Sequence, residues 1–134
     1  MTACYLDASA LVKLVADEAE SQALREHLGS FSARLTSRIA TVEVPRALSR
    51  KGPESSALAG ELVVAAFDSV SLIELDTEIA KRAALLLPAT LRSLDAIHLA
   101  SALSLREELT VVVTYDARFA EAARGAGLTV MAPA

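Results

Sequence analysis

Four acidic residues of this sequence stand beside or inside apolar runs, where a charged carboxylate is costly. They are Asp7, Glu43, Asp95 and Asp116, in the segments CYLDASALVKL, IATVEVPRAL, LRSLDAIHLASAL and TVVVTYDARFAEAA. Removing an ionised carboxylate from water costs several kcal/mol unless a partner compensates for the lost hydration. The chain offers few cations nearby, so a divalent metal ion is the natural partner if the four side chains converge. The pattern predicts metal-dependent phosphodiester chemistry.

Each of these acids also has a simpler interpretation. Asp7 and Asp116 each precede a segment with helical periodicity and could cap it. Asp95 lies in the first turn of its helix, where the helix dipole favours a carboxylate. Glu43 could form a surface pair with Arg46. Capping explains one isolated acid well, but it explains the shared apolar setting of all four less well. The other acids lie in polar stretches or at element ends, which is typical of solvated faces.

Segments with strand and helix patterns alternate along the whole chain. The strand candidates are residues 3–6, 31–35, 70–75, 111–114 and 128–131, and the helix candidates are 9–15, 18–28, 37–50, 54–67, 77–87, 93–108 and 117–124. This alternation predicts one α/β domain over residues 1–134, a three-layer sandwich with a mainly parallel central sheet flanked by helices. Pro45 removes one helical hydrogen bond, so we expect a kink or restart there.

The predicted sheet places the acids near one another. Ligands of open parallel sheets bind beyond the carboxyl ends of the strands. Asp7 directly follows the first strand and Asp116 follows the strand at 111–114, so we expect both at that end of the sheet. Asp95 and Glu43 can reach the same place from helices.

The overall composition fits a packed domain. The chain has 134 residues, of which 53% are hydrophobic and 4% aromatic, so its core must be mainly aliphatic. A single cysteine, Cys4, excludes an intramolecular disulfide and the usual multi-cysteine zinc site. The first residues lack a secretory signal pattern, and the longest apolar stretch, LVVAAFDSVSLIEL, is interrupted by Asp68. We therefore expect a cytoplasmic protein that does not enter a membrane.

The net charge of −4 argues against a general polyanion-binding protein. The four candidate acids account for this excess, because the other 13 Asp and Glu residues balance the 13 Lys and Arg residues. Bound divalent ions would neutralise the site itself. A local groove for RNA is compatible with this balance.

Other side chains have candidate supporting roles. The hydroxyls of Ser9 and Thr114 could orient a carboxylate or a water molecule, or could equally cap helices. His98 follows Asp95 by three residues, and its apolar neighbours favour a hydrogen bond in the core over metal ligation. A group of arginines near Glu43 could contact phosphates, although exposed helix charges are usually only solvated: Arg34, Arg38, Arg46 and Arg50.

Four blocks of the sequence resemble the PIN-domain nucleases, and most of all the VapC-type toxins of bacterial toxin–antitoxin pairs. The blocks are LDASALVKL, ATVEVPRAL, LDAIHLASAL and TYDARFAEAARGAGLTV, and together they span nearly the whole chain. Their shared features are Asp-x-Ser after the first strand, Glu on the third helix, Asp at a helix start, and Thr-x-Asp after a strand. Pro45, two residues after Glu43, departs from an ideal helix.

The resemblance implies a function. It implies that Asp7, Glu43, Asp95 and Asp116 bind Mg²⁺ or Mn²⁺ and that the protein is an endoribonuclease. We expect water as the nucleophile and products with 5′-phosphate and 3′-hydroxyl ends, because no histidine pair is available for attack by the 2′-hydroxyl. As a toxin, it would arrest growth by cutting RNA of the translation machinery.

The resemblance further implies a cognate VapB-type antitoxin as partner and a homodimer of the nuclease. Candidate contact surfaces are the apolar residues of the first helix, from Leu11 to Val15, and the segment from Leu62 to Val64. Packing in the core is the alternative role for both.

Other functions remain in competition. A receiver-like signalling domain also clusters acids around Mg²⁺, but it needs a lysine near its last strands, and the lysines here are Lys13, Lys51 and Lys81. A haloacid-type phosphatase would have Asp-x-Asp after the first strand, where this chain has Asp-x-Ser. A PIN-domain nuclease of RNA processing, without a toxin role, would have the same site, and a neighbouring antitoxin gene would distinguish it.

Overall fold

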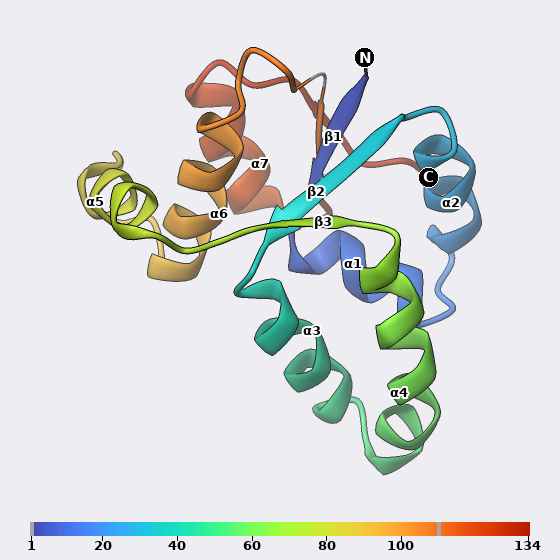
Figure 1. Ribbon diagram of the computed structural model, residues 1–134. Helices are drawn as coiled ribbons and strands as arrows, with labels where there is room; N and C mark the ends of the chain where they lie inside the picture. The colour runs from blue at the N-terminus through green and yellow to red at the C-terminus, as the bar shows by residue number, and fades with distance from the viewer. Residues whose placement is uncertain (1, 110) are drawn as a thin grey trace.

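The computed structural model describes residues 2–109 and 111–134, apart from the side chains of residues 54–59. Its strands are β1 (Ala3–Leu6), β2 (Ala33–Ser37), β3 (Ser71–Ile73), β4 (Val111–Val113) and β5 (Val130–Met131). Its helices are α1 (Ala8–Val15), α2 (Ser21–Leu28), α3 (Ala40–Ser49), α4 (Pro53–Asp68), α5 (Thr77–Leu85), α6 (Ser93–Leu103) and α7 (Ala117–Gly125). Figure 1 shows their arrangement.

The strands form one sheet in the order β3-β2-β1-β4-β5, and every neighbouring pair is parallel. The central strand β1 pairs with β2 on one side and with β4 on the other, so that Cys4 lies opposite Arg34 and opposite Val111. Parallel strands need crossover connections, and the helices between them supply these. The predicted α/β class with a parallel central sheet is confirmed.

Helices cover both faces of the sheet. Side chains of alternate strand residues point to opposite faces, so Cys4 and Leu6 pack with α1 to α4, whereas Tyr5 packs with α6 and α7. In Figure 1, α6 and α7 lie on one side of the sheet and α1 to α4 on the other. Full burial of a large apolar side chain contributes about 1.5–3 kcal/mol to the stability of the fold. The two apolar clusters, one on each face of the sheet, therefore hold the carboxyl end of β1 in place.

Several elements are shorter or shifted relative to the predicted ranges. The strand predicted at 31–35 lies at Ala33–Ser37, because Phe31 still donates to the carbonyl of Leu28 at the end of α2. The outer strands β3 and β5 are three and two residues long. Helix α6 ends at Leu103 instead of residue 108. Pro45 lies within the single helix α3, so the predicted restart does not occur.

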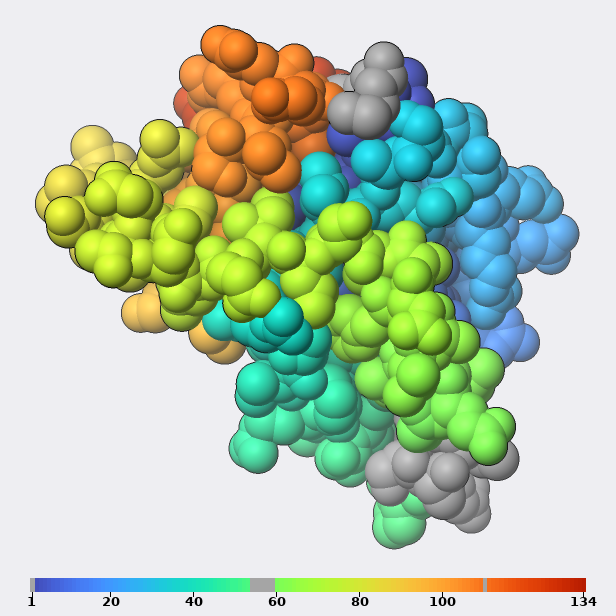
Figure 2. Space-filling view, in the orientation of Figure 1, coloured from blue at the N-terminus to red at the C-terminus, as the bar shows by residue number. Residues whose placement is uncertain are grey.

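The two candidate contact surfaces have different environments. Leu11 and Val15 are buried in the core, so the packing alternative holds for the first helix. Leu62 and Val64 on α4 are 50% and 62% exposed. Figure 2 shows the segment from α4 through β3 to α5 crossing one face of the molecule. Among the helices of the described residues, none combines the length and the hydropathy needed to cross a membrane.

Candidate active site

The site lies where the chain changes direction within the sheet. From β1 the chain adds β2 and β3 on one side, and β4 and β5 lie on the other side. Such a switch point, at the carboxyl ends of the strands, is where open α/β sheets bind ligands. Asp7 directly follows β1, and the segment from Thr114 to Asp116 directly follows β4.

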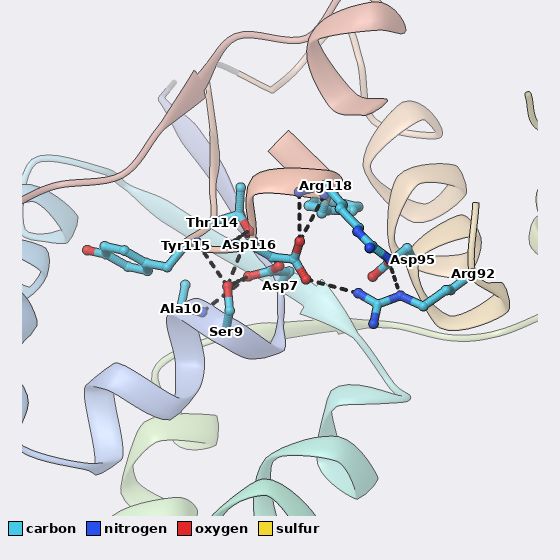
Figure 3. A network of polar contacts seen from close by, with 10 residues as sticks. Asp7, Ser9, Ala10, Arg92, Asp95, Thr114, Tyr115, Asp116 and Arg118 are labelled. Atoms are coloured by element: carbon cyan, nitrogen blue, oxygen red, sulfur yellow. Dashed lines mark hydrogen bonds and ion pairs between the residues drawn. The ribbon is translucent and has the colours of Figure 1, made fainter. Parts of the chain in front are cut away.

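The carboxylate of Asp7 is buried, and both of its oxygens accept hydrogen bonds. Asp7 is 5% exposed, and its Oδ1 accepts hydrogen bonds from the Ser9 hydroxyl at 2.6 Å and from the Ala10 amide at 3.1 Å. Its Oδ2 accepts from the Thr114 hydroxyl at 2.6 Å. Figure 3 shows these contacts, which join α1 to the end of β4. The predicted cap of α1 by Asp7 is confirmed.

The hydroxyls of Ser9 and Thr114 are themselves held by the backbone of the next loop. The amide of Tyr115 donates to the Ser9 hydroxyl at 2.9 Å, and the amide of Asp116 donates to the Thr114 hydroxyl at 3.1 Å. The two hydroxyls lie 3.2 Å apart. Each can therefore direct its proton toward Asp7, which fits the predicted role of orienting a carboxylate.

Within the part of the chain that the structure describes, no cation bonds the carboxylate of Asp7. All three hydrogen-bond donors to its carboxylate are neutral groups. Burial raises the pKa of the Asp7 carboxyl above its usual value, although the bonds from Ser9 and Thr114 oppose this shift. The ionised form of this carboxyl would therefore gain stability from a nearby cation.

Asp116 and Asp95 share one cation, Arg92. Oδ1 of Asp116 caps α7 by accepting from the amides of Arg118 and Phe119 at 2.9 and 3.1 Å. Its Oδ2 accepts from Arg92 at 3.1 Å. Oδ2 of Asp95, in the first turn of α6, accepts from Nε of Arg92 at 3.1 Å. Figure 3 shows the guanidinium reaching both carboxylates.

Arg92 corrects the expectation that few cations lie near the four acids. It precedes Asp95 by three residues, so a pair along the helix start was visible in the sequence. Its contact with Asp116 spans 24 residues and depends on the fold. The Arg92 side chain is 60% exposed, so solvent screens both pairs.

Glu43 is held by a histidine. Oε1 of Glu43 is hydrogen bonded to Nε2 of His98 at 2.7 Å, and Nδ1 of His98 is hydrogen bonded to the Tyr5 hydroxyl at 2.6 Å. Among the described residues, the partner of Glu43 is therefore His98 and not Arg46. His98 is 2% exposed, and it makes the predicted hydrogen bond in the core. Burial raises the pKa of Tyr5 well above its usual value.

All four predicted acids line one cavity of about 290 Å³. Its wall also includes Ala8, Ser9, Arg92, Ser93, Leu94 and His98. Within the described residues, no three carboxylate, histidine or cysteine side chains already stand in an arrangement that could hold a metal ion. The structure thus brings the acids to one place, with Arg92 engaging two of them.

The predicted group of arginines separates in the structure. Arg46 and Arg50 line a neighbouring cavity of about 550 Å³, which shares Ser9 and Glu43 with the acidic cavity. By contrast, Arg34 donates to the carbonyl of Leu28 at 3.0 Å. Arg38 pairs with Glu74 in an exposed contact.

The donor set of the acidic cavity suits a hard divalent cation. Carboxylate and hydroxyl oxygens are the ligands that Mg²⁺ and Mn²⁺ prefer. A buried carboxylate bonded only to neutral donors, such as Asp7, gains most from such an ion. The residues present therefore fit a metal of this type, with Asp7, Glu43, Asp95 and Asp116 as the side chains that would hold it.

Comparisons with known proteins identify the family of this chain. The family model of the PIN domain matches residues 4–125. Ribonuclease VapC46 of Mycobacterium tuberculosis is 46% identical to this chain over 99% of both sequences. The structure of VapC20 of Mycobacterium tuberculosis, described as a Sarcin-Ricin loop cleaving toxin, matches 97% of this chain and 99% of its own with a TM-score of 0.71 at 17% identity.

A toxin–antitoxin complex from Klebsiella pneumoniae has the same fold, with a TM-score of 0.70 at 21% identity, and the match covers 98% of each chain. At these identities the two structures support the fold alone. The family assignment rests on the PIN domain match and on the VapC relatives. The chain therefore belongs to the PIN-domain family and, within it, to the VapC-type ribonucleases.

Proposed function

We propose that this protein is a Mg²⁺- or Mn²⁺-dependent endoribonuclease and the toxin of a toxin–antitoxin pair. The observation that carries this proposal is the single cavity lined by Asp7, Glu43, Asp95 and Asp116 at the switch point of the sheet. Ribonuclease VapC46, at 46% identity over nearly the full length, supports RNA as the substrate. RNA of the translation machinery is the proposed target class, and the cytoplasm is the proposed location.

The residues of the cavity have different proposed roles in binding the metal ion and the substrate. A metal ion bound there would lower the barrier by activating water and by neutralising charge on the departing oxygen. Asp7 is fixed by three hydrogen bonds, so its oxygens need little reorganisation to meet a cation. A metal ion would compete with Arg92 for Oδ2 of Asp95 and Oδ2 of Asp116, and a displaced Arg92 would remain at the cavity rim as a donor for a substrate phosphate.

A VapB-type antitoxin is the proposed partner. The solved structures that share this fold include a toxin–antitoxin complex and VapBC2 of Rickettsia felis bound to a fragment of promoter DNA. We also propose that the nuclease forms a homodimer. The exposed Leu62 and Val64 of α4 remain candidate contact residues for such a surface.

Replacing Arg92 should separate metal binding from RNA binding. In the Arg92→Gln variant, a metal ion no longer competes with the guanidinium for Asp95 and Asp116. We expect a several-fold lower dissociation constant for Mn²⁺, measured by calorimetry without RNA. Because the variant lacks a cationic phosphate donor, we also expect weaker binding of RNA by the metal-free protein.

Arg38→Gln is the matched control, because Arg38 is also an exposed arginine in an ion pair but lies outside the acidic cavity. It should leave the affinity for Mn²⁺ unchanged. Equal effects of the two substitutions would show that overall charge, and not the position of Arg92, determines the result.

The experiment that tests the proposed function is a short pulse of expression followed by mapping of RNA ends in the cell. We expect new 5′-phosphate ends at a small number of sites, with growth arrest that co-expression of the cognate antitoxin relieves. Ends with 2′,3′-cyclic phosphates would contradict water-dependent hydrolysis. No new ends in growth-arrested cells would contradict the ribonuclease assignment.

A further inference from the structure

Three side chains from three elements form a buried chain of hydrogen bonds that ends in the acidic cavity. The Tyr5 hydroxyl of β1 lies 2.6 Å from Nδ1 of His98 on α6, and Nε2 of His98 lies 2.7 Å from Oε1 of Glu43 on α3. Tyr5 and His98 are buried, and the Glu43 side chain is 21% exposed. This series of hydrogen bonds thus leads from the core to the cavity wall.

The direction of the protons follows from the chemistry of the groups. An ionised carboxylate only accepts, so Nε2 of His98 must carry the proton that bonds Glu43. In a neutral imidazole Nδ1 is then an acceptor, and the Tyr5 hydroxyl must donate to it. The Thr36 and Ser101 hydroxyls beside Tyr5 donate elsewhere, to the carbonyls of Leu6 at 2.6 Å and Ile97 at 2.7 Å. The bond from Tyr5 therefore supports the tautomer of His98 that donates to Glu43.

This arrangement leaves one oxygen of Glu43 available. Oε1 accepts from His98, and among the described residues Oε2 has no hydrogen-bond partner. The ring of His98 is confined by edge contacts with Tyr5 and Phe119, at centroid distances of 5.8 and 6.1 Å. A glutamate has three rotatable side-chain bonds, so a fixed partner on Oε1 restricts where Oε2 can lie.

We infer that Tyr5 and His98 are positioning residues that hold the Glu43 carboxylate for a divalent cation. This inference rests on the proposed function, because it assigns Glu43 to the metal. Neither residue needs to touch the ion or the RNA. Groups that hydrogen bond to metal ligands typically change metal affinity by about 10–100-fold when they are replaced.

The test compares the wild-type protein with His98→Leu, His98→Gln and Tyr5→Phe, using the dissociation constant for Mn²⁺ measured by calorimetry without RNA. His98→Leu removes the donor to Glu43, and we expect binding weaker by about 10–100-fold. His98→Gln keeps an amide donor and should recover at least part of the loss. Tyr5→Phe removes the hydrogen bond to Nδ1 of His98 but leaves the bond from Nε2 to Glu43, so it should have an intermediate effect. His27→Leu, which changes the other histidine outside the cavity, should have no effect.

A double substitution distinguishes positioning from a general structural role. If His98 acts through Glu43, His98→Leu should cause no further loss of Mn²⁺ affinity in a Glu43→Gln background. Equal losses in both backgrounds would overturn the inference, and so would wild-type affinity in the Tyr5→Phe and His98→Leu variants. If His98→Leu does not fold, Tyr5→Phe and His98→Gln carry the comparison alone.

The outcome also separates this inference from the proposed function. A wild-type protein that binds Mn²⁺ and cleaves RNA, together with unaffected variants, would overturn only the positioning role. A wild-type protein that binds no Mn²⁺ would overturn the metal-dependent function and the positioning role with it.

Discussion

The Asp7→Asn variant should lose RNA cleavage by about a thousandfold or more while it keeps its fold. A metal ion at a phosphodiester contributes several kcal/mol to the stabilisation of the transition state, and each 1.4 kcal/mol corresponds to about tenfold in rate. Asparagine is nearly the same size as aspartate but lacks its negative charge. Cleavage of a mapped RNA site in excess Mg²⁺, at matched protein concentration, measures the loss.

The hydrogen bonds around Asp7 explain why the fold should survive this change. An asparagine at this position can accept from Ser9 and Ala10 through its oxygen, so the cap of α1 remains. Its amide group can donate to the Thr114 hydroxyl, which can redirect its own proton to Ser9 at 3.2 Å.

The variant should also be more stable than wild type without metal, and the difference should depend on pH. Burial raises the pKa of Asp7 in the folded state, so the folded protein holds this proton more tightly than the unfolded chain. As pH rises from about 4 through that raised pKa, wild type therefore loses stability relative to Asp7→Asn. Above it, the difference in the free energy of unfolding is constant. Urea unfolding with a chelator across this range measures it.

Asp76→Asn is the matched control for the cleavage measurement. Asp76 caps α5 through the amide of Ile79 at 2.9 Å but lies outside the acidic cavity. Its substitution should leave the cleavage rate unchanged. Cleavage by Asp7→Asn within tenfold of the wild-type rate would remove Asp7 from the mechanism.

Mg²⁺ or Mn²⁺ should raise the thermal stability of the wild-type protein. An ion that binds only the folded state adds about 2.7 kcal/mol to the free energy of unfolding at a concentration one hundred times its Kd. For a chain of this size, that corresponds to a rise of roughly 10 °C in the unfolding midpoint. The physical source is the buried carboxylate of Asp7, in a cavity that three further carboxylates line.

Scanning calorimetry with and without added ion measures this shift. It should vanish in Asp7→Asn and persist in Asp17→Asn, which changes an exposed acid outside the cavity. A midpoint that does not move at millimolar ion would count against a metal site. A shift that persists in Asp7→Asn would place the ion elsewhere.

The order of elements and the positions of Asp7 and Asp116 could be predicted because they depend on local sequence. Each of these residues follows a short apolar strand and precedes a helix, and parallel strands bring their ends together. The outer strands were predicted too long, since they pair on one side only and hydropathy does not report where pairing stops.

Most long-range partners of the acids could not be predicted in the same way. His98 bonds Glu43 across 55 residues, and Arg92 bonds Asp116 across 24 residues. Periodicity identifies a face of a helix but does not specify which distant side chain that face meets. Arg92 was the exception, because its spacing from Asp95 is local and its pairing with that residue was detectable.

The brevity of β3 and β5 has a consequence for how the free nuclease behaves at high concentration. A sheet border exposes unpaired amide and carbonyl groups that can template the addition of a strand from another chain. Borders of three and two residues offer few such groups. The short edge strands therefore limit amyloid-like aggregation through strand addition when the protein is present without a binding partner.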